Sequence, residues 1–263
     1  MLQFIPRYHH IKTLTIGLFV CLLATISHRA EAQTNPRVNS DNFNTWVVYN
    51  GQHLITDKFG LHAEVQIRRN EGFSSWQQLL LRPGIFYKLN KNVLTTAGYA
   101  YVETYPYGDI PIAKTAFPEH RIWEQLQLSQ QTGGVDITNR LRLEQRFFGD
   151  AAIGTFTNVR YENRVRYMFK ANIPLGKTSP LYVPVYDEVF IAFGKNVKYN
   201  MFDQNRFGLG LGLNTGKYTK VELGYLYQYV QQRNLTAAFN QVVENNHTIA
   251  INVFSSLPFK SHN

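Results

Sequence analysis

Arginine and glutamate residues alternate with mostly apolar residues in the centre of the chain. In the stretch NRLRLEQRFF, the charged side chains share one parity: Arg140, Arg142, Glu144 and Arg146. Because side chains alternate between the two faces of a β-strand, such a strand carries a row of charges on one face. Guanidinium groups form paired hydrogen bonds with carboxylates and other oxyanions. The spacing therefore predicts either ion pairs with neighbouring strands or the binding of anions.

The same alternation in other segments places further charged residues on the corresponding face, and arginine predominates among them. The full set is Glu64, Arg68, Arg82, Arg142, Glu144, Arg146, Glu162, Arg164, Arg166, Glu188 and Arg206. Our hypothesis takes as the candidate functional cluster Arg82, Arg142, Glu144, Arg146, Arg164, Arg166, Glu188 and Arg206. Two interpretations stay open, because a charge pattern alone does not separate a self-neutralising set of ion pairs from a selectivity or ligand site.

Residue types that serve catalysis or metal binding do not occur in the required arrangements. The chain has no G-x-S-x-G, H-E-x-x-H or C-x-x-C motif. His120 and Ser129 share one predicted strand, but they are nine positions apart, which corresponds to about 30 Å and is too far for a hydrogen-bonded pair. Glu119, His120 and Arg121 are expected to cap the end of that strand. We predict no enzymatic activity, no catalytic residue, no cofactor and no metal site.

The N-terminal residues have the features of a secretory signal peptide. A basic start precedes an apolar run of 13 residues, LTIGLFVCLLATI, which is short for a membrane span. An A-x-A cleavage site ends at Ala32, so we expect residues 1–32 to be removed and residues 33–263 to form one domain. Cys21, the one cysteine of the chain, lies in the apolar run. The exported chain is therefore expected to have neither a disulfide nor a cysteine metal site.

Segments with period-two alternation recur through the rest of the chain and predict an all-β fold. Eleven such segments occur, at 45–55, 59–69, 75–89, 93–105, 119–130, 135–147, 158–172, 182–193, 204–214, 218–231 and 245–254. Several are longer than the 5–6 residues usual for strands of soluble sheets. Short and long links alternate, as do the turns and external loops of outer-membrane barrels. The long links are 106–118, 148–157, 194–203 and 232–243.

These features predict a single antiparallel transmembrane β-barrel rather than a soluble sandwich of two sheets, although the same alternation permits both. In a barrel the apolar face meets lipid, the charged face lines the lumen, and closure pairs every strand. Tyrosine and phenylalanine residues near strand ends match the aromatic belts of membrane interfaces. Because single-chain bacterial barrels have even strand numbers, we expect 10 or 12 strands. Either a further strand lies within residues 33–45, or one of the eleven predicted segments is not a strand.

The basic charge of the chain restricts its partners. The formal net charge is +9 at pH 7, and removal of Arg7, Lys12, Arg29 and Glu31 with the signal peptide leaves about +7. An exported chain without a basic helix or a base-stacking module lacks the features of a nucleic-acid-binding protein. We expect the outer membrane of a Gram-negative bacterium as its location, with lipid and lipopolysaccharide around it and small anionic solutes as ligands.

Several short motifs follow one another along the chain: NTWVVY, RLRLEQRF, NRVRYMF, DEVFIAFG, FDQNRFG and VELGYLYQ. Through them, residues 44–254 resemble the domain of unknown function 2490 family, whose members are predicted exported outer-membrane barrels of uncharacterised function. The resemblance implies this fold and supplies no catalytic residue. Arg142, Glu144 and Arg146 match the central run of the family. Glu188 and Arg206 match recurring positions on successive strands, and we expect these two side chains to pair across the lumen.

Three functional interpretations follow. The first is a small pore, transporter or binding protein whose arginine-rich lumen favours anionic solutes. The second is a closed barrel with a salt-bridged lumen and a structural or surface-presenting role. The third, less favoured, is a lipid-modifying enzyme of the outer membrane.

Overall fold

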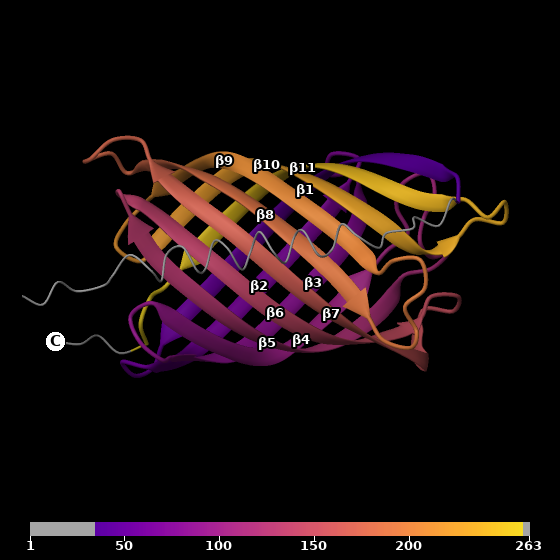
Figure 1. Cartoon of the computed structure of the whole chain (residues 1–263), viewed down its shortest axis with the longest axis horizontal. Helices are drawn as coiled ribbons and strands as arrows, with labels where there is room; N and C mark the ends of the chain where they lie inside the picture. Colours follow the sequence, from indigo (N-terminus) through magenta and orange to yellow (C-terminus); the bar gives the residue numbers. More distant parts are fainter. Residues whose placement is uncertain (1–34, 260–263) are drawn as a thin grey trace, which may run out of the picture. The chain divides into compact units, whose positions relative to one another are not determined.

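The computed structural model describes residues 35–259, and in this part of the chain the regular elements are eleven β-strands that close into a barrel (Figure 1). The strands are β1 (Arg37–Leu54), β2 (Phe59–Asn70), β3 (Ser75–Lys88), β4 (Val93–Thr104), β5 (Phe117–Thr132), β6 (Val135–Asp150), β7 (Thr155–Pro174), β8 (Leu181–Phe193), β9 (Phe202–Asn214), β10 (Thr219–Leu235) and β11 (Gln241–Ser255). Between residues 35 and 259, no helix is long and apolar enough to cross a membrane. The predicted signal peptide lies outside the described residues.

The barrel closes between its first and last strands. β1 and β11 run parallel, from Arg37 opposite Gln241 to Gly51 opposite Ser255, whereas each strand is antiparallel to its neighbour in sequence. An odd number of strands in up-and-down order leaves the first and last pointing the same way, so the closure requires a parallel pair. The expectation of 10 or 12 strands in a wholly antiparallel barrel is therefore wrong. The closed barrel also excludes the sandwich of two sheets.

The eleven strands are the eleven segments indicated by the alternation, with one large difference in bounds. β1 begins at Arg37 rather than at residue 45. Residues 37–45 therefore extend the first predicted strand and do not form a twelfth strand. Their alternation has no apolar face, because Ser40 and Asn42 are buried while Asn39 and Asp41 are exposed. Hydrophobic periodicity could not reveal a stretch in which both faces are polar.

The register of the strands sets their tilt. A path through directly opposed residues returns to β1 14 residues from its start, passing from Ser40 through Glu244, Val230, Gln204, Phe190, Arg166, Arg142, Gln125, Thr96, Phe86 and Gly60 to Leu54. With strands about 4.8 Å apart and a rise of about 3.3 Å per residue, this shift inclines the strands by about 40° to the barrel axis. Figure 1 shows the tilt of the strands. A tilt of this size brings residues of strands that are not neighbours to the same height along the barrel axis.

The two ends of the barrel differ in their connections. We call the end where β1 begins the loop end, because it carries the longest link, residues 105–116 between β4 and β5. The opposite end, the turn end, has links of two to six residues. The shortest is Gly133-Gly134, with φ angles of 58° and 85°, which suits a hairpin turn that requires positive φ at both central residues. The predicted long links 148–157 and 232–243 are partly strand, since β6 to β7 and β10 to β11 are joined by four and five residues.

The barrel has a polar interior and an apolar exterior. On β9, Leu209 and Leu211 expose 48% and 49% of their surface, whereas Arg142 and Glu144 on β6 expose 2% and 0%. This distribution is the reverse of that in a soluble protein, where charged residues are almost never fully buried unless paired. The charged residues of the lumen must therefore find partners within the barrel.

Candidate functional site

The eight residues of the predicted cluster lie on the inner face of the barrel. They come from β3, β6, β7, β8 and β9, and none exposes more than 9% of its surface: Arg82, Arg142, Glu144, Arg146, Arg164, Arg166, Glu188 and Arg206. The other three residues of the same parity set, Glu64, Arg68 and Glu162, are buried there as well. Strand alternation thus placed all eleven on one face, and the tilt brings them to neighbouring heights.

Glu144 lies at the centre of the ion pairs in the lumen. Its carboxylate lies 2.5 Å from Arg164 and 2.8 Å from Arg166, both on β7. Two further guanidinium groups reach it from the other side, Arg82 at 3.6 Å and Arg121 at 4.0 Å. One buried carboxylate therefore holds together arginines from three strands, β3, β5 and β7.

Each of these four arginines also contacts a second carboxylate. Arg82 pairs with Glu64 at 2.8 Å, and Arg121 pairs with Glu119 at 2.6 Å. Arg164 pairs with Asp203 at 2.7 Å, and Arg166 pairs with Glu188 at 2.8 Å. The result is a continuous buried network, which satisfies the charges that a low-dielectric interior would otherwise penalise.

Glu188 and Arg206 do not form the predicted pair. They stand directly opposite each other on β8 and β9, but the ion pairs of Glu188 are with Arg140 at 2.7 Å and Arg166 at 2.8 Å. Long guanidinium side chains from β6 and β7 reach this carboxylate, so register alone does not choose its partners. The Arg206 guanidinium instead lies over the rings of Trp46 and Phe190, at 5.2 Å and 4.7 Å from their centroids.

Aromatic rings fill the space between these charged groups. Trp123 exposes none of its surface and lies under Arg142 at 4.8 Å. Phe190 is equally buried and lies under Arg164, Arg166 and Arg206. We call Glu64, Arg82, Trp123, Arg142, Glu144, Arg166, Glu188 and Phe190 the central layer. It divides the lumen into two cavities that share no lining residue.

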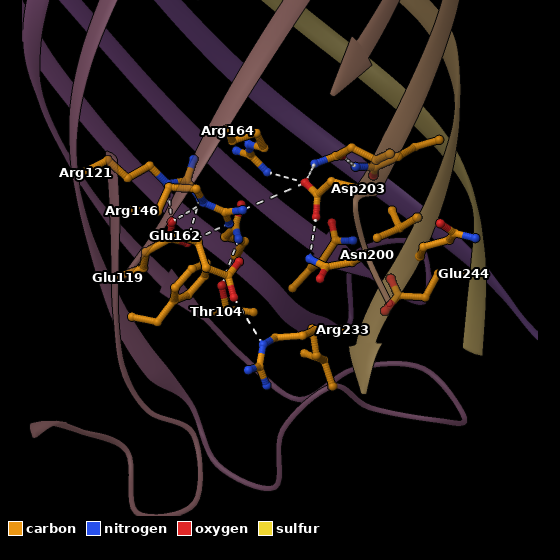
Figure 2. A pocket seen from close by; sticks show the side chains of 18 of the residues that line it. Thr104, Glu119, Arg121, Arg146, Glu162, Arg164, Asn200, Asp203, Arg233 and Glu244 are labelled. Atoms are coloured by element: carbon orange, nitrogen blue, oxygen red, sulfur yellow. Dashed lines mark hydrogen bonds and ion pairs between the residues drawn. The ribbon is translucent and has the colours of Figure 1, made fainter. Parts of the chain in front are cut away.

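The cavity towards the loop end, which we call the loop vestibule, is strongly basic. It has a volume of about 140 Å³ and is lined by nine arginines but only four carboxylates, Glu119, Glu162, Asp203 and Glu244. Figure 2 shows Glu119 beside Arg121 and Arg146, which it contacts at 2.6 Å each. Some of these arginines also pair with Glu64, Glu144 and Glu188 behind the cavity wall, and the remaining excess of guanidinium groups is of the sign that attracts anions.

The cavity towards the turn end, the turn vestibule, is also basic. Its volume is about 320 Å³. One carboxylate, that of Glu222, lines it together with five cationic side chains, Arg140, Arg142, Lys170, Lys217 and Lys220. Lys170 pairs with Glu222 at 2.7 Å, so most of the positive charge of this mouth has no carboxylate on the cavity wall.

The link between β4 and β5 contacts the mouth of the loop vestibule. The Tyr107 hydroxyl donates to the Glu244 carboxylate on β11, and the Gln232 side-chain amide donates to the Ile110 carbonyl at 2.8 Å. Burial and the Glu244 charge raise the pKa of the Tyr107 phenol well above its usual value, so the hydroxyl stays a donor at neutral pH. These two bonds hold residues 105–116 at the rim of the barrel.

The predictions made from the sequence missed part of this network of ion pairs. Glu119 and Arg121 were expected to cap a strand end, but both are buried on the inner face of β5 and pair with each other. The same alternation that identified β6 could have found them, since Phe117, Glu119, Arg121 and Trp123 share one parity. The glutamines that solvate the arginines carry no charge and gave no signal.

Sequence comparison relates the chain to other proteins. The family described as "Protein of unknown function (DUF2490)" matches residues 43–238. An uncharacterized protein of Methylorubrum extorquens is 30% identical over 195 residues, which make up 73% of this chain and 78% of that protein. No solved structure matches the chain.

Proposed function

The chain belongs to the DUF2490 family of proteins of unknown function, and from this membership and the geometry of the lumen we propose that it is an outer-membrane barrel that binds small anionic solutes. The proposal includes export after cleavage near Ala32, insertion into the outer membrane of a Gram-negative bacterium, and contact with its lipid and lipopolysaccharide. The single observation that carries the solute class is the loop vestibule, where nine arginines line the cavity and two of them, Arg68 and Arg206, have no carboxylate partner among residues 35–259.

The outer surface supports the membrane part of the proposal. Large apolar side chains stay exposed all around the barrel, among them Ile85 at 52%, Ile122 at 51%, Leu141 at 49% and Leu223 at 56%. Exposed apolar surface of this extent is costly in water and stable in hydrocarbon. Strands of 12 to 20 residues exceed the 9–11 residues that a tilted strand needs to cross a bilayer.

Aromatic and histidine side chains lie together on the outer face. His120 contacts Tyr99 and Tyr101, and the corresponding group on β10 and β11 places His247 beside Tyr225 and Tyr227. Amphipathic rings of this kind collect at the level of lipid head groups. Two such groups on different sides of the barrel support one interfacial belt towards the loop end.

The central layer bears on how the barrel handles a solute. Arg142, Glu144 and Trp123 fill the middle of the lumen with at most 2% of their surface exposed. An anion that enters either vestibule therefore meets a closed layer. Binding follows from the vestibules directly, whereas passage through the barrel would require the ion pairs of the layer to rearrange.

Binding and conductance measurements test the proposal together. We expect the purified barrel to bind sulfate, phosphate or acetate in calorimetry, and to be closed in planar bilayers apart from rare openings that pass anions preferentially. Replacing Arg142 and Arg146 by glutamate should weaken that preference, because both line the lumen. Cation-selective current, or failure to bind any of these anions, would contradict the proposal.

A second function is favoured by the central network itself. A barrel in which Glu144 joins four arginines could serve as a closed scaffold that presents its loops at the cell surface. Absence of both anion binding and current, in a barrel that folds and inserts, would support this alternative.

A further inference from the structure

Most buried arginines of the lumen have a carboxylate partner, and the exceptions are informative. Among residues 35–259, three arginines at least nine-tenths buried form no ion pair with any carboxylate: Arg68, Arg142 and Arg206. Arg142 belongs to the central layer and donates to the Gln125 amide oxygen at 2.6 and 2.9 Å. Arg68 and Arg206 both line the loop vestibule.

Arg68 and Arg206 meet at one indole ring. The Arg68 guanidinium carbon lies 3.9 Å from the ring centroid of Trp46, and that of Arg206 lies 5.2 Å from it. The two positive charges are therefore at most about 9 Å apart. Each ring contact is favourable by itself, but neither supplies a negative charge.

The hydrogen-bond partners of these two arginines are neutral amides. Arg68 donates to Gln66 Oε1 from Nε at 2.9 Å and to Gln78 Oε1 from Nη1 at 2.7 Å. With the Gln228 amide turned so that its oxygen faces Arg206, that oxygen accepts from Nε at 3.2 Å and Nη2 at 3.1 Å. The amides fix the guanidinium groups in place without neutralising them.

The wall formed by β5, β6 and β7 provides the contrast within the same cavity. There Glu119 pairs with Arg121 and Arg146, and Glu162 pairs with Arg160 at 2.9 Å. That wall neutralises much of its own charge. The wall around Trp46 has two guanidinium groups and several glutamines and no ion pair, so its charge is left for a ligand.

We propose that Arg68 and Arg206, which both lie over the Trp46 ring and are positioned by glutamines, form a binding site for a small oxyanion. This inference rests on the proposed function and assigns it to one wall of the loop vestibule. The ligand group is a carboxylate, phosphate or sulfate, because guanidinium forks match the geometry of planar and tetrahedral oxyanions. A cavity of about 140 Å³ is smaller than the 300–1,000 Å³ usual for drug-sized ligands, so the anion is small.

Calorimetric titration of the intact barrel in detergent with sulfate, inorganic phosphate and acetate, at constant ionic strength, tests the site. The variants are Arg68→Gln, Arg206→Gln and the double substitution. The matched control is Arg233→Gln, which removes the same charge from the same cavity, but from an arginine paired with Glu162 at 3.1 Å. Heat-modifiable gel migration reports folding of each variant independently of binding.

We expect each single variant to bind the preferred anion at least tenfold more weakly and the double variant to show no binding. Arg233→Gln should change the affinity less than threefold. Without anion, Arg68→Gln and Arg206→Gln should fold at least as well as the wild type, since they remove an uncompensated buried charge.

Two results overturn different statements. Wild-type affinity in Arg68→Gln and Arg206→Gln, with loss of binding in Arg233→Gln, would refute the site and leave anion binding by the vestibule intact. Failure of the wild-type barrel itself to bind any of the three anions would refute the proposed function, and the site with it.

Discussion

Replacing Glu144 by glutamine is expected to destabilise the barrel by about 3–5 kcal/mol, the usual effect of removing one partner from a buried ion pair. Glu144 has no exposed surface and lies within 4.0 Å of four guanidinium groups. The four contacts do not add up to four such losses. Arg82, Arg121, Arg164 and Arg166 each keep a second carboxylate within 2.8 Å, so the variant leaves a net positive network rather than four unpaired charges.

Equilibrium unfolding of the barrel in lipid bilayers by guanidinium chloride, followed by tryptophan fluorescence, measures this loss. Glu124→Gln is the matched control, because the same substitution is made on the neighbouring strand β5, at an exposed carboxylate on the outer face. Its hydrogen bond is from the neutral Gln145 amide at 3.2 Å. We expect Glu124→Gln to leave the free energy of unfolding unchanged or to raise it, since it removes a charge that faces lipid.

The outcome that would refute this reasoning is a loss below about 1 kcal/mol for Glu144→Gln, comparable with that of a surface ion pair. An equal loss for Glu124→Gln would refute it as well, because the effect would then follow net charge rather than the buried network. Unfolding transitions with equal slopes in the wild type and both variants are needed for the comparison.

Two further predictions concern packing and the loop. Gly212→Ala should lower the free energy of unfolding by about 1–3 kcal/mol, because a Cβ there would overlap the Tyr182 ring. Gly216→Ala should leave stability unchanged, since no atom of the described residues lies within 4 Å of the added carbon. The midpoint of chemical unfolding should therefore fall for Gly212→Ala and stay the same for Gly216→Ala. Tyr107→Phe should increase the rate of proteolysis within residues 105–116 several-fold at neutral pH, because it removes the bond to Glu244; an unchanged rate would show that this bond does not hold the loop. Since the pKa of Tyr107 is raised, its contribution is complete below the ordinary tyrosine pKa of about 10 and is lost only as the pH rises through the higher folded value.

Strand positions were predictable from the sequence wherever one face is apolar and the other polar. The alternation located eleven strands and placed the predicted arginines and glutamates inside, since parity alone decides the face. It failed for residues 37–44 of β1, where both faces are polar. The interpretation of Glu119 and Arg121 as a strand-end cap was wrong because the parity rule, which applies to β5 as it does to β6, was not used for them.

The partners of the charged residues were not predictable in the same way. Glu188 and Arg206 are neighbours in register, yet Glu188 pairs with Arg140 and Arg166. An arginine side chain is long enough to reach beyond the opposing residue, and a tilt of about 40° brings further strands within that reach. Pairing in a narrow lumen therefore depends on barrel geometry, which only the register of all eleven strands defines.

The strand number sets the width of the lumen, and the width determines how much of the lumen charged side chains can fill. A barrel of this size can fill its interior with its own side chains, and here the filling is ionic: Glu144 and Glu188 join arginines of several strands. The buried side chains between residues 35 and 259 include eight arginines and eight carboxylates, and ion pairs among them neutralise most of this charge. Seven of the nine arginines of the loop vestibule have a carboxylate partner, on the cavity wall or behind it, whereas Arg68 and Arg206 are buried without an ion pair in this part of the chain. Charge buried without a counterion raises the free energy of the folded state, so the proposed anion would supply the counterion of Arg68 and Arg206 and stabilise the barrel.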